Sequence, residues 1–342
     1  MSRESIPHLC HEDIWVAFSM PGSKDYCFFI GQEVDSYSDG ACFMLQGWNR
    51  TRDERLYIRP QNIQHNTAWQ YMVQDICHLS SSLRPDYESM IQRTVDALRA
   101  KDFEKAVISK IKVVSREEQD TCELYRALHR TYPQAFTFMY NIPGKGTWCG
   151  ASPEILLTAE GECLKTMALA GTLAIDGREL SDIPWTPKEI HEQAVIESYV
   201  EESCRDLCLD YEKEGPITVQ AGAMAHLQST YHIEATSDIE KLIDRLHPGP
   251  AICGRPQHTS KQWIKEIEEH DREHYCGFLG PWNIEGQKAL FVHLRSMRIY
   301  MDHYVLYLGG GITADSDPKA EWDETELKAL TMLSVINSTV HG

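Results

Sequence analysis

Short apolar segments separated by turn residues make up the chain as far as about Arg84. The segments CFFIGQ and ACFMLQGW, for example, are bounded by Gly, Asp and Asn. Segments of this length between turn formers are typical of β-strands. From Pro85 the buried-type positions follow helical spacing instead. They are Met90, Ile91, Thr94, Val95 and Leu98. We therefore expect a strand-rich N-terminal part followed by a helix.

The rest of the chain mixes extended and helical patterns. The sequence predicts strands over 105–114, 136–140, 155–158, 163–174, 217–233, 289–300 and 303–309. It predicts helices over 124–132, 186–210 and 260–272, and a last helix from Pro318. Because most strands follow one another through turns and not through helices, the pattern favours an α+β fold with antiparallel sheets and outer helices.

Charge and length narrow the class of protein. Asp and Glu number 51 against 33 Lys and Arg, which gives a net charge of −18 and argues against nucleic acid or an anionic membrane as a partner. A small anionic ligand would then need locally placed cations, a metal ion or aligned backbone N–H groups. The 342 residues contain no repeat, low-complexity tract or Gly/Ser linker, so we expect one continuous domain.

No targeting or disulfide signal is visible. No window approaches about 18 uninterrupted apolar residues, and the start lacks the apolar core of a secretory signal. The eleven cysteines are an odd number without a C-x-x-C pair. We interpret them as buried or half-buried thiols in a reducing cytoplasm, and their spacing indicates no zinc site.

One lysine falls on the apolar face of a predicted strand. In KAVISKIKVV, Lys105 is in phase with Val107 and Ile111, while Lys110 and Lys112 point to the opposite face. A desolvated lysine has a lowered pKa and can act as a general base. A lysine at a strand end that reaches solvent is the alternative at this stage.

The helix over 186–210 has a strong start signal. Thr186, Pro187 and Glu189 match the N-cap, N1 and N3 positions of a capping box. Glu192 then heads the apolar stripe of this helix, where an unpaired charge is costly. A metal ion or a basic partner would relieve that cost. An exposed glutamate in the first turn is the alternative.

The last helix carries a second set of charges on one face, Glu321, Glu324 and Lys328. Glu324 and Lys328 alone would suggest an ordinary surface ion pair. Carboxylates from two separate helices also suit Mg²⁺, which commonly takes one or two of them together with water and substrate oxygens.

Three further positions are candidates for ligand contact or catalysis. Arg295 is in phase with apolar residues of FVHLRSMRI, and an inward guanidinium favours a carboxylate ligand. Gly309 begins a triple glycine that allows close backbone approach. Glu154 follows Ser-Pro and has few charged neighbours, so it can stay protonated and act as a general acid.

These segments together resemble the chorismate-utilising enzymes. That family includes isochorismate synthase, salicylate synthase, anthranilate synthase component I and aminodeoxychorismate synthase component I. The matching stretches run in family order from about residue 103 to 332. They are KAVISK, GASPEILL, LAGT, the helix with His191-Glu192, HPGPAICGRP, YCGFLG, LRSMRI and YLGGGITADSDPKAEWDETELK. The resemblance implies one chorismate-binding domain over 1–342, in which 1–85 is poor in motifs and 86–342 carries them.

The resemblance also implies a fold and a mechanism. The fold is two antiparallel β-sheets packed at a steep angle, with helices on the outside and the site in a deep cleft. Lys105 is expected to activate water for attack on C2 of chorismate, and Glu154 to protonate the departing C4 hydroxyl. The implied metal ligands for Mg²⁺ are Glu192, Glu324 and Glu321, the last of them through water or from a second layer. The implied substrate-binding residues are Thr172, His247, Tyr275, Arg295, Gly309 and Lys328.

Residues that vary in the family favour isochorismate synthase. Lys105 stands where anthranilate synthases usually carry Gln, and Ala170 where many aminodeoxychorismate synthases place a nucleophilic Lys. Leu173 replaces the Arg often found in salicylate synthases. Salicylate synthase stays the alternative, and the ammonia-using synthases are less favoured. We expect a cytoplasmic monomer without an amidotransferase partner, in menaquinone or siderophore synthesis.

Overall fold

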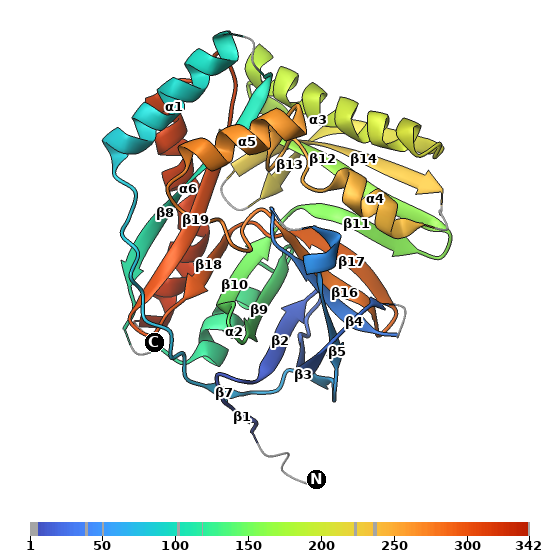
Figure 1. Ribbon diagram of the computed structural model, residues 1–342, viewed down its shortest axis with the longest axis vertical. Coiled ribbons are helices and arrows are strands. Elements are labelled where there is room, and N and C mark those ends of the chain that lie inside the picture. The colour runs from blue at the N-terminus through green and yellow to red at the C-terminus, as the bar shows by residue number, and fades with distance from the viewer. Residues whose placement is uncertain are drawn as a thin grey trace.

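The computed structural model of the protein describes residues 6–37, 40–49, 51–100, 103–117, 119–221, 224–234 and 238–340. The α-helices in this part of the chain are α1 (Arg84–Arg99), α2 (Thr121–Thr131), α3 (Pro187–Asp206), α4 (Ile239–Leu246), α5 (Gln257–Ile267) and α6 (Pro318–Val340). Two short 3-10 helices span Arg52–Glu54 and Leu180–Asp182. The helices lie around the strands, on the outside of the molecule (Figure 1).

The strands occur in every part of the chain. The N-terminal ones are β1 (His8–Leu9), β2 (Ile14–Ser19), β3 (Cys27–Val34), β4 (Cys42–Gln46), β5 (Leu56–Pro60), β6 (Gln64–His65) and β7 (Gln70–Tyr71). The middle ones are β8 (Lys105–Ser115), β9 (Phe136–Ile142), β10 (Gly146–Ser152), β11 (Ile155–Glu160), β12 (Cys163–Ala174), β13 (Tyr211–Ala221) and β14 (Met224–Glu234). The C-terminal ones are β15 (Gly254–Arg255), β16 (Phe278–Ile284), β17 (Gln287–Val292), β18 (Ser296–Ile299) and β19 (His303–Ile312).

Antiparallel pairing dominates the sheet structure. Among the described strands only the short pair β1 and β7 is parallel. β8 pairs with β19 along its length, from Ala106 opposite Ile312 to Ser115 opposite His303. Shared strands join the sheets: β11 pairs with β12 on one side and β17 on the other, so the hydrogen-bonded network closes on itself. The predicted α+β class with antiparallel sheets and outer helices is confirmed.

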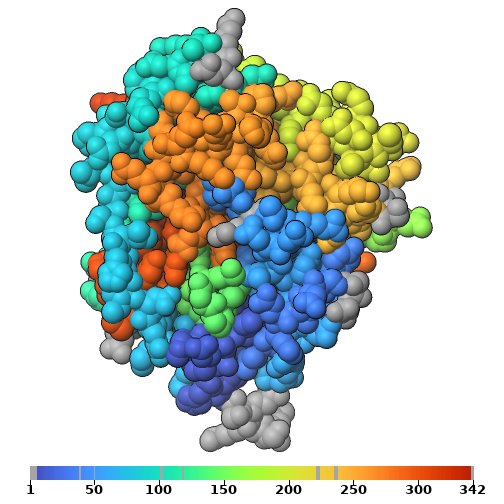
Figure 2. Space-filling view, viewed as in Figure 1, coloured from blue at the N-terminus to red at the C-terminus, as the bar shows by residue number. Residues whose placement is uncertain are grey.

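The N-terminal strands are built into the same network as the later ones. β2 pairs with β9, and β4 pairs with β16. Phe136 of β9 stacks on Phe291 of β17 with ring centroids 4.1 Å apart, in the core beneath these strands. Figure 2 shows the N-terminal residues, in blue, forming the lower part of one face and the residues near 250–275, in orange, forming its upper part.

Several local predictions are confirmed by the structure. α3 begins with the predicted capping box, in which the Thr186 backbone N–H donates to Glu189 Oε2 at 3.0 Å. α6 begins after Asp317, whose carboxylate accepts from the Ala320 N–H at 2.8 Å. The predicted strand over 163–174 is β12 without change. The strand predicted over 217–233 is a hairpin of β13 and β14, and residues 222 and 223 lie outside the described residues.

Other elements were not predicted. β10, with the sequence GTWCGAS, is buried on both faces and therefore shows no alternation of apolar and polar residues. α4 buries Leu242, Ile243 and Leu246, but it is only eight residues long and follows two strands closely. The expectation of buried or half-buried thiols is wrong for Cys10, Cys163 and Cys208, which are exposed. Among the described residues no helix is long and apolar enough to span a membrane.

Candidate active site

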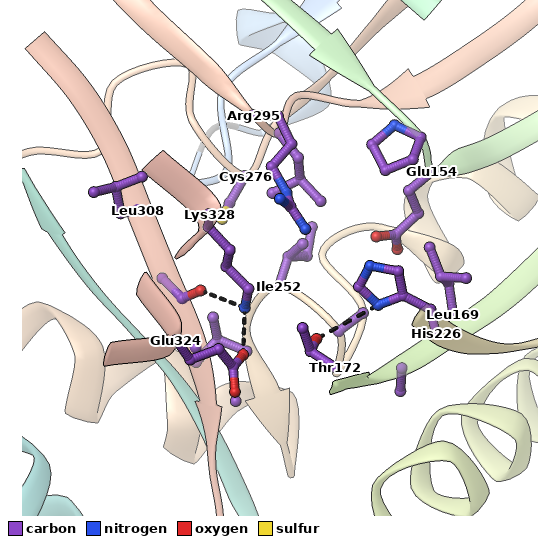
Figure 3. A pocket seen from close by; sticks show the side chains of 18 of the residues that line it. Glu154, Leu169, Thr172, His226, Ile252, Cys276, Arg295, Leu308, Glu324 and Lys328 are labelled. Carbon is purple, nitrogen blue, oxygen red and sulfur yellow. Dashed lines mark hydrogen bonds and ion pairs between the residues drawn. The ribbon is translucent and has the colours of Figure 1, made fainter. Parts of the chain in front are cut away.

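Residues from several helices, strands and loops line one cavity. α3 contributes Glu192, β19 contributes Gly309 to Gly311, and α6 contributes Glu324 and Lys328. Glu154, His226 and Arg295 line it from the other strands and loops. Its empty volume, including the part open to solvent, is about 780 Å³. Figure 3 shows Lys328 and Glu324 on one side of this cavity and Glu154 with His226 on the other.

Lys105 is buried and ion-paired. Its side chain is 1% exposed, and Nζ donates to Glu192 Oε1 at 2.7 Å. The alternative of a strand-end lysine in solvent is therefore wrong, because this side chain is buried and pairs with Glu192 of α3. Lys105 does not itself line the cavity but lies directly behind Glu192, which does. A side chain at Gly311 would place its Cβ 2.5 Å from Glu192 Oε1, so this pair requires glycine on the neighbouring strand.

Glu192 is held ionised by the lysine. Burial alone would raise the pKa of Glu192, but the charge and hydrogen bond of Lys105, with the charge of Lys328, outweigh burial and lower it. The side chain is 16% exposed, so the alternative of an ordinary solvent-exposed glutamate is wrong. A negative charge thus stands at the cavity wall near neutral pH.

The two carboxylates of α6 have different surroundings. Glu324 pairs with Lys328 at 2.6 Å, and both line the cavity, so this pair is not an ordinary surface ion pair. Glu321 does not line the cavity. It is 1% exposed, pairs with Lys188 at 3.0 Å and accepts from Ser316 at 2.7 Å. Burial and the charge of Glu324 raise the pKa of Glu321, which shows that negative charge is crowded on this side.

Glu154 has the surroundings of a general acid. It follows Pro153 between β10 and β11 and is 9% exposed. Burial raises the pKa of Glu154 to about 7, although the positive charges of Lys105, Arg295 and Lys328 oppose the shift. The prediction that this carboxyl keeps a proton near neutral pH agrees with this environment.

Cationic and hydroxyl groups surround the opposite part of the cavity. Lys328 Nζ donates to the Gly309 carbonyl at 2.9 Å. A Cβ on Gly309 would stand 3.0 Å from the Tyr275 hydroxyl, and Tyr275 lines the same cavity. Arg295 also lines it, but strand phase does not explain its position. Arg295 lies between β17 and β18, where the chain turns. Its φ there is +48°, and this conformation directs the guanidinium into the cavity.

His247 and Thr172 take different positions. Thr172 lines the cavity, and its Oγ1 lies 3.4 Å from Nδ1 of His226. His247 is buried behind the wall, where its Nε2 donates to the carbonyl of Cys276 at 3.0 Å. His247 is thus not among the residues that line the cavity, and its contact with substrate stays a prediction.

Sequence reasoning missed His226. Its Nδ1–H donates to the Gly171 carbonyl at 2.7 Å, which leaves Nε2 as a buried acceptor without a protein partner. Burial and the charge of Arg295 lower the pKa of His226 to about 3, so the ring is neutral at pH 7. The only sequence signal was a histidine inside the apolar run of β14, and such residues are usually structural.

Comparisons with known proteins agree with this geometry. A family model described as chorismate binding enzyme matches residues 44–337. The chain is 28% identical over 259 residues to isochorismate synthase EntC of Escherichia coli K12, which is 73% of this chain and 66% of the relative. It is 28% identical over 265 residues to isochorismate synthase DhbC of Bacillus subtilis, which is 72% and 67% of the two chains. The chain thus spans about two thirds of these relatives.

Solved structures show the same fold. The putative 2,3-dihydroxybenzoate-specific isochorismate synthase of Bacillus anthracis superimposes with a TM-score of 0.79 at 23% identity, over 96% of both chains. The menaquinone-specific isochorismate synthase of Escherichia coli gives 0.80 at 17% identity, over 94% of this chain and 88% of that one. The cavity therefore lies in a fold of chorismate-utilising enzymes. The chain belongs to the chorismate binding enzyme family.

Proposed function

We propose that this protein is an isochorismate synthase, an isomerase that converts chorismate to isochorismate. Membership of the chorismate binding enzyme family indicates a small-molecule substrate, and the relatives reported above are isochorismate synthases. The observation that carries the proposal is that a candidate base and a candidate acid lie at the same cavity. Buried Lys105 lies behind one wall, and Glu154, whose carboxyl favours the protonated form, lies in another.

Two proton transfers suffice for the reaction. Lys105 accepts a proton from a water molecule as the water oxygen bonds to C2 of the ring. The ring double bonds shift, the C4–O bond breaks, and Glu154 donates its proton so that the C4 hydroxyl leaves as water. One water enters and one leaves, and the proton taken up by Lys105 returns through solvent to Glu154. General acid and base catalysis of this kind contributes about 10²- to 10⁴-fold each.

The remaining wall residues hold the two carboxylates of the substrate. Arg295 and Tyr275 are suited to the enolpyruvyl carboxylate, since a guanidinium and a hydroxyl both donate to it. Lys328 and the Gly309 backbone are suited to the ring carboxylate, because Lys328 Nζ already lies 2.9 Å from the Gly309 carbonyl. Thr172 and His226 lie beside Glu154 and fix the side of the ring that the acid meets.

The carboxylates of the cavity fit a divalent ion. Glu192 and Glu324 would hold Mg²⁺, with Glu321 behind them, since this ion prefers carboxylate oxygens together with water and substrate. The raised pKa of Glu321 beside Glu324 marks an excess of negative charge that a divalent cation would neutralise. When bound, the ion would supply positive charge opposite the ring carboxylate. With Glu192 turned to the ion, Lys105 would lose this ion pair and could act as a base.

The family resemblance extends the proposal to organisation. We propose that residues 1–342 form one domain and act as a monomer without an amidotransferase partner. The N-terminal strands support the first point because they pair with β9 and β16. One relative is named a vibriobactin-specific isochorismate synthase, and one solved structure is of a menaquinone-specific isochorismate synthase. Both menaquinone and siderophore synthesis therefore stay open for this chain.

Product identification tests the proposal. Purified protein is incubated with chorismate and Mg²⁺, and the products are separated by chromatography. The expected product is isochorismate, and Lys105→Ala protein serves as the control that should give none. Salicylate with pyruvate would show a salicylate synthase instead. An aminated product formed only when ammonium is present would show an ammonia-using synthase.

A further inference from the structure

A cluster of three metal-ligand side chains lies outside the cavity. Cys27 is the first residue of β3, His65 is the last of β6, and Glu285 stands in the turn between β16 and β17. One ligand atom from each lies within 4.8 Å of the other two. None of the three residues lines the cavity described above. Cysteine spacing could not have indicated the cluster, since its members are far apart in the sequence.

Backbone pairing fixes the positions of these side chains. Cys27 and His65 are directly opposite each other in the antiparallel ladder of β3 and β6, so their side chains point to the same face. Glu285 has a φ of +50° and is followed by Gly286 in a tight hairpin turn. This turn aims its carboxylate at the pair, and the arrangement needs no movement of the main chain.

The three side chains are close enough to share one ion. Cys27 Sγ lies 3.8 Å from His65 Nδ1 and 3.5 Å from Glu285 Oε2, and one ligand atom of each residue lies within 4.8 Å of the other two. Without an ion, the other ring nitrogen of His65, Nε2, contacts Glu285 Oε1 at 2.9 Å. Ligand bonds of about 2.3 Å to sulfur and about 2.0 Å to nitrogen or oxygen place tetrahedral ligand atoms roughly 3.3–3.6 Å apart. Small side-chain rotations would bring the three atoms to a common centre.

An ion can reach the cluster from solvent and would displace the proton of the Cys27 thiol. Burial and the neighbouring charges of Glu285 and Asp25 raise the pKa of Cys27 to about 12, so the thiol keeps its proton while no cation is near. A bound metal ion reverses this preference, because a coordinating thiol is deprotonated. His65 and Glu285 are 48% and 45% exposed, which gives an ion access from solvent.

We propose that Cys27, His65 and Glu285 form a surface site for Zn²⁺, with water as the fourth ligand. The mixed sulfur, nitrogen and oxygen donors select Zn²⁺ over Mg²⁺, which takes oxygen ligands only. The site joins the paired strands β3 and β6 to the turn between β16 and β17, so an ion there would stabilise the N-terminal strands. This inference does not depend on the proposed isochorismate synthase activity.

Cobalt binding provides the direct test. The full chain is stripped of metal with a chelator and titrated with Co²⁺, whose bond to a thiolate gives a charge-transfer band in the near ultraviolet. We expect this band to saturate at one equivalent and to be displaced by Zn²⁺. Cys27→Ser should abolish it, and Glu285→Gln should weaken Zn²⁺ binding at least about tenfold by calorimetry.

A matched cysteine provides the control. Cys163 is exposed, whereas Cys27 is half-buried, and both lie in β-strands. Among the described residues, Cys163 does not belong to a group of three metal-ligand side chains. Cys163→Ser should keep both the band and the Zn²⁺ affinity, and Cys27→Ser should keep its activity with Mg²⁺. Absence of the band in the unaltered protein, or its persistence in Cys27→Ser, would overturn the proposal. Circular dichroism of each variant confirms that it is folded.

Discussion

Each face of β8 carries one buried lysine. Comparing the surroundings of these two lysines shows how a candidate catalytic lysine differs from a structural one. Lys105 and Lys110 are both 1% exposed, and each pairs with one glutamate of a helix. Lys105 lies on the face of β8 that is nearer to the cavity. Gly311 of the neighbouring strand β19 lies next to its side chain, and a Cβ at Gly311 would stand 2.8 Å from Lys105 Cε. Lys110 lies under α6, between Glu326 and the ring of Trp322, and is not among the residues that line the candidate active site.

A shifted pKa alone does not distinguish the two lysines. Burial lowers the pKa of Lys110 to about 8, yet this lysine has no access to substrate. What distinguishes Lys105 is that its partner, Glu192, forms part of the cavity wall. A buried lysine therefore becomes a candidate base through the position of its partner, since general-base chemistry requires reach before it requires a tuned pKa.

Replacing Lys105 should have the largest effect. Lys105→Ala should lower kcat about 10²- to 10⁴-fold, because the water loses its base, and chorismate should still bind. Lys110→Met is the matched control from the other face of the strand. Steady-state kinetics and calorimetric binding of chorismate measure both variants. A Lys105→Ala enzyme with kcat near the unaltered value would remove this residue from the mechanism.

The pH dependence of the free energy of unfolding reports whether the Glu154 carboxyl is protonated. A raised pKa in the folded protein stabilises it below about pH 4.5, and that contribution is lost as pH rises through about 7. Relative to Glu154→Gln, which does not titrate, the unaltered protein should lose about 3 kcal/mol between pH 4.5 and pH 8, at 1.36 kcal/mol per pKa unit. Urea unfolding of both proteins at several pH values measures this. A constant difference would contradict an acid that keeps its proton near neutrality.

The partners of the two lysines should differ in their relation to metal. Glu192→Gln should weaken the apparent affinity for Mg²⁺ by at least about tenfold, because a cavity carboxylate is lost. Glu326→Gln removes the partner of Lys110 and should leave the Mg²⁺ titration of activity unchanged. Equal shifts in the two variants would show that the effect comes from loss of a lysine partner and not from loss of a metal ligand.

Lys110→Met should have the smallest effect on activity. We expect kcat within about threefold of the unaltered enzyme, since this lysine does not line the candidate active site. The free energy of unfolding should fall by about 1–3 kcal/mol, because Glu326 loses a partly buried partner. Urea unfolding and kinetics on the same sample separate the two effects. A large loss of activity with unchanged stability would place Lys110 in the catalytic machinery.

Local rules recovered much of the site from the sequence. The two-residue period of β8 predicted that Lys105 lies on the apolar face of the strand. The capping box predicted where α3 begins, and with it the position of Glu192 in the second turn of the helix. These features depend on neighbours within one element. Arg295 lines the cavity, but not because of its phase in a strand. A positive φ in the turn between β17 and β18 directs its side chain inward.

Long-range contacts limited the rest. His226 enters the cavity because Gly171, on the paired strand β12, fixes its ring, and no pattern within β14 reports that contact. The cluster of Cys27, His65 and Glu285 forms only when β3, β6 and the turn between β16 and β17 come together. His247 matched a family position, yet its ring supports the Cys276 backbone from behind the wall. Side-chain partners of this kind are properties of the folded chain.

Isotope labelling of the product tests the central claim most directly. Turnover of chorismate in water enriched in ¹⁸O should give isochorismate with one heavy oxygen at C2, because the attacking water supplies that hydroxyl. Mass spectrometry of the purified product measures the incorporation. Isochorismate without solvent oxygen would show that the hydroxyl migrates within the substrate, and Lys105 would then have no water to activate.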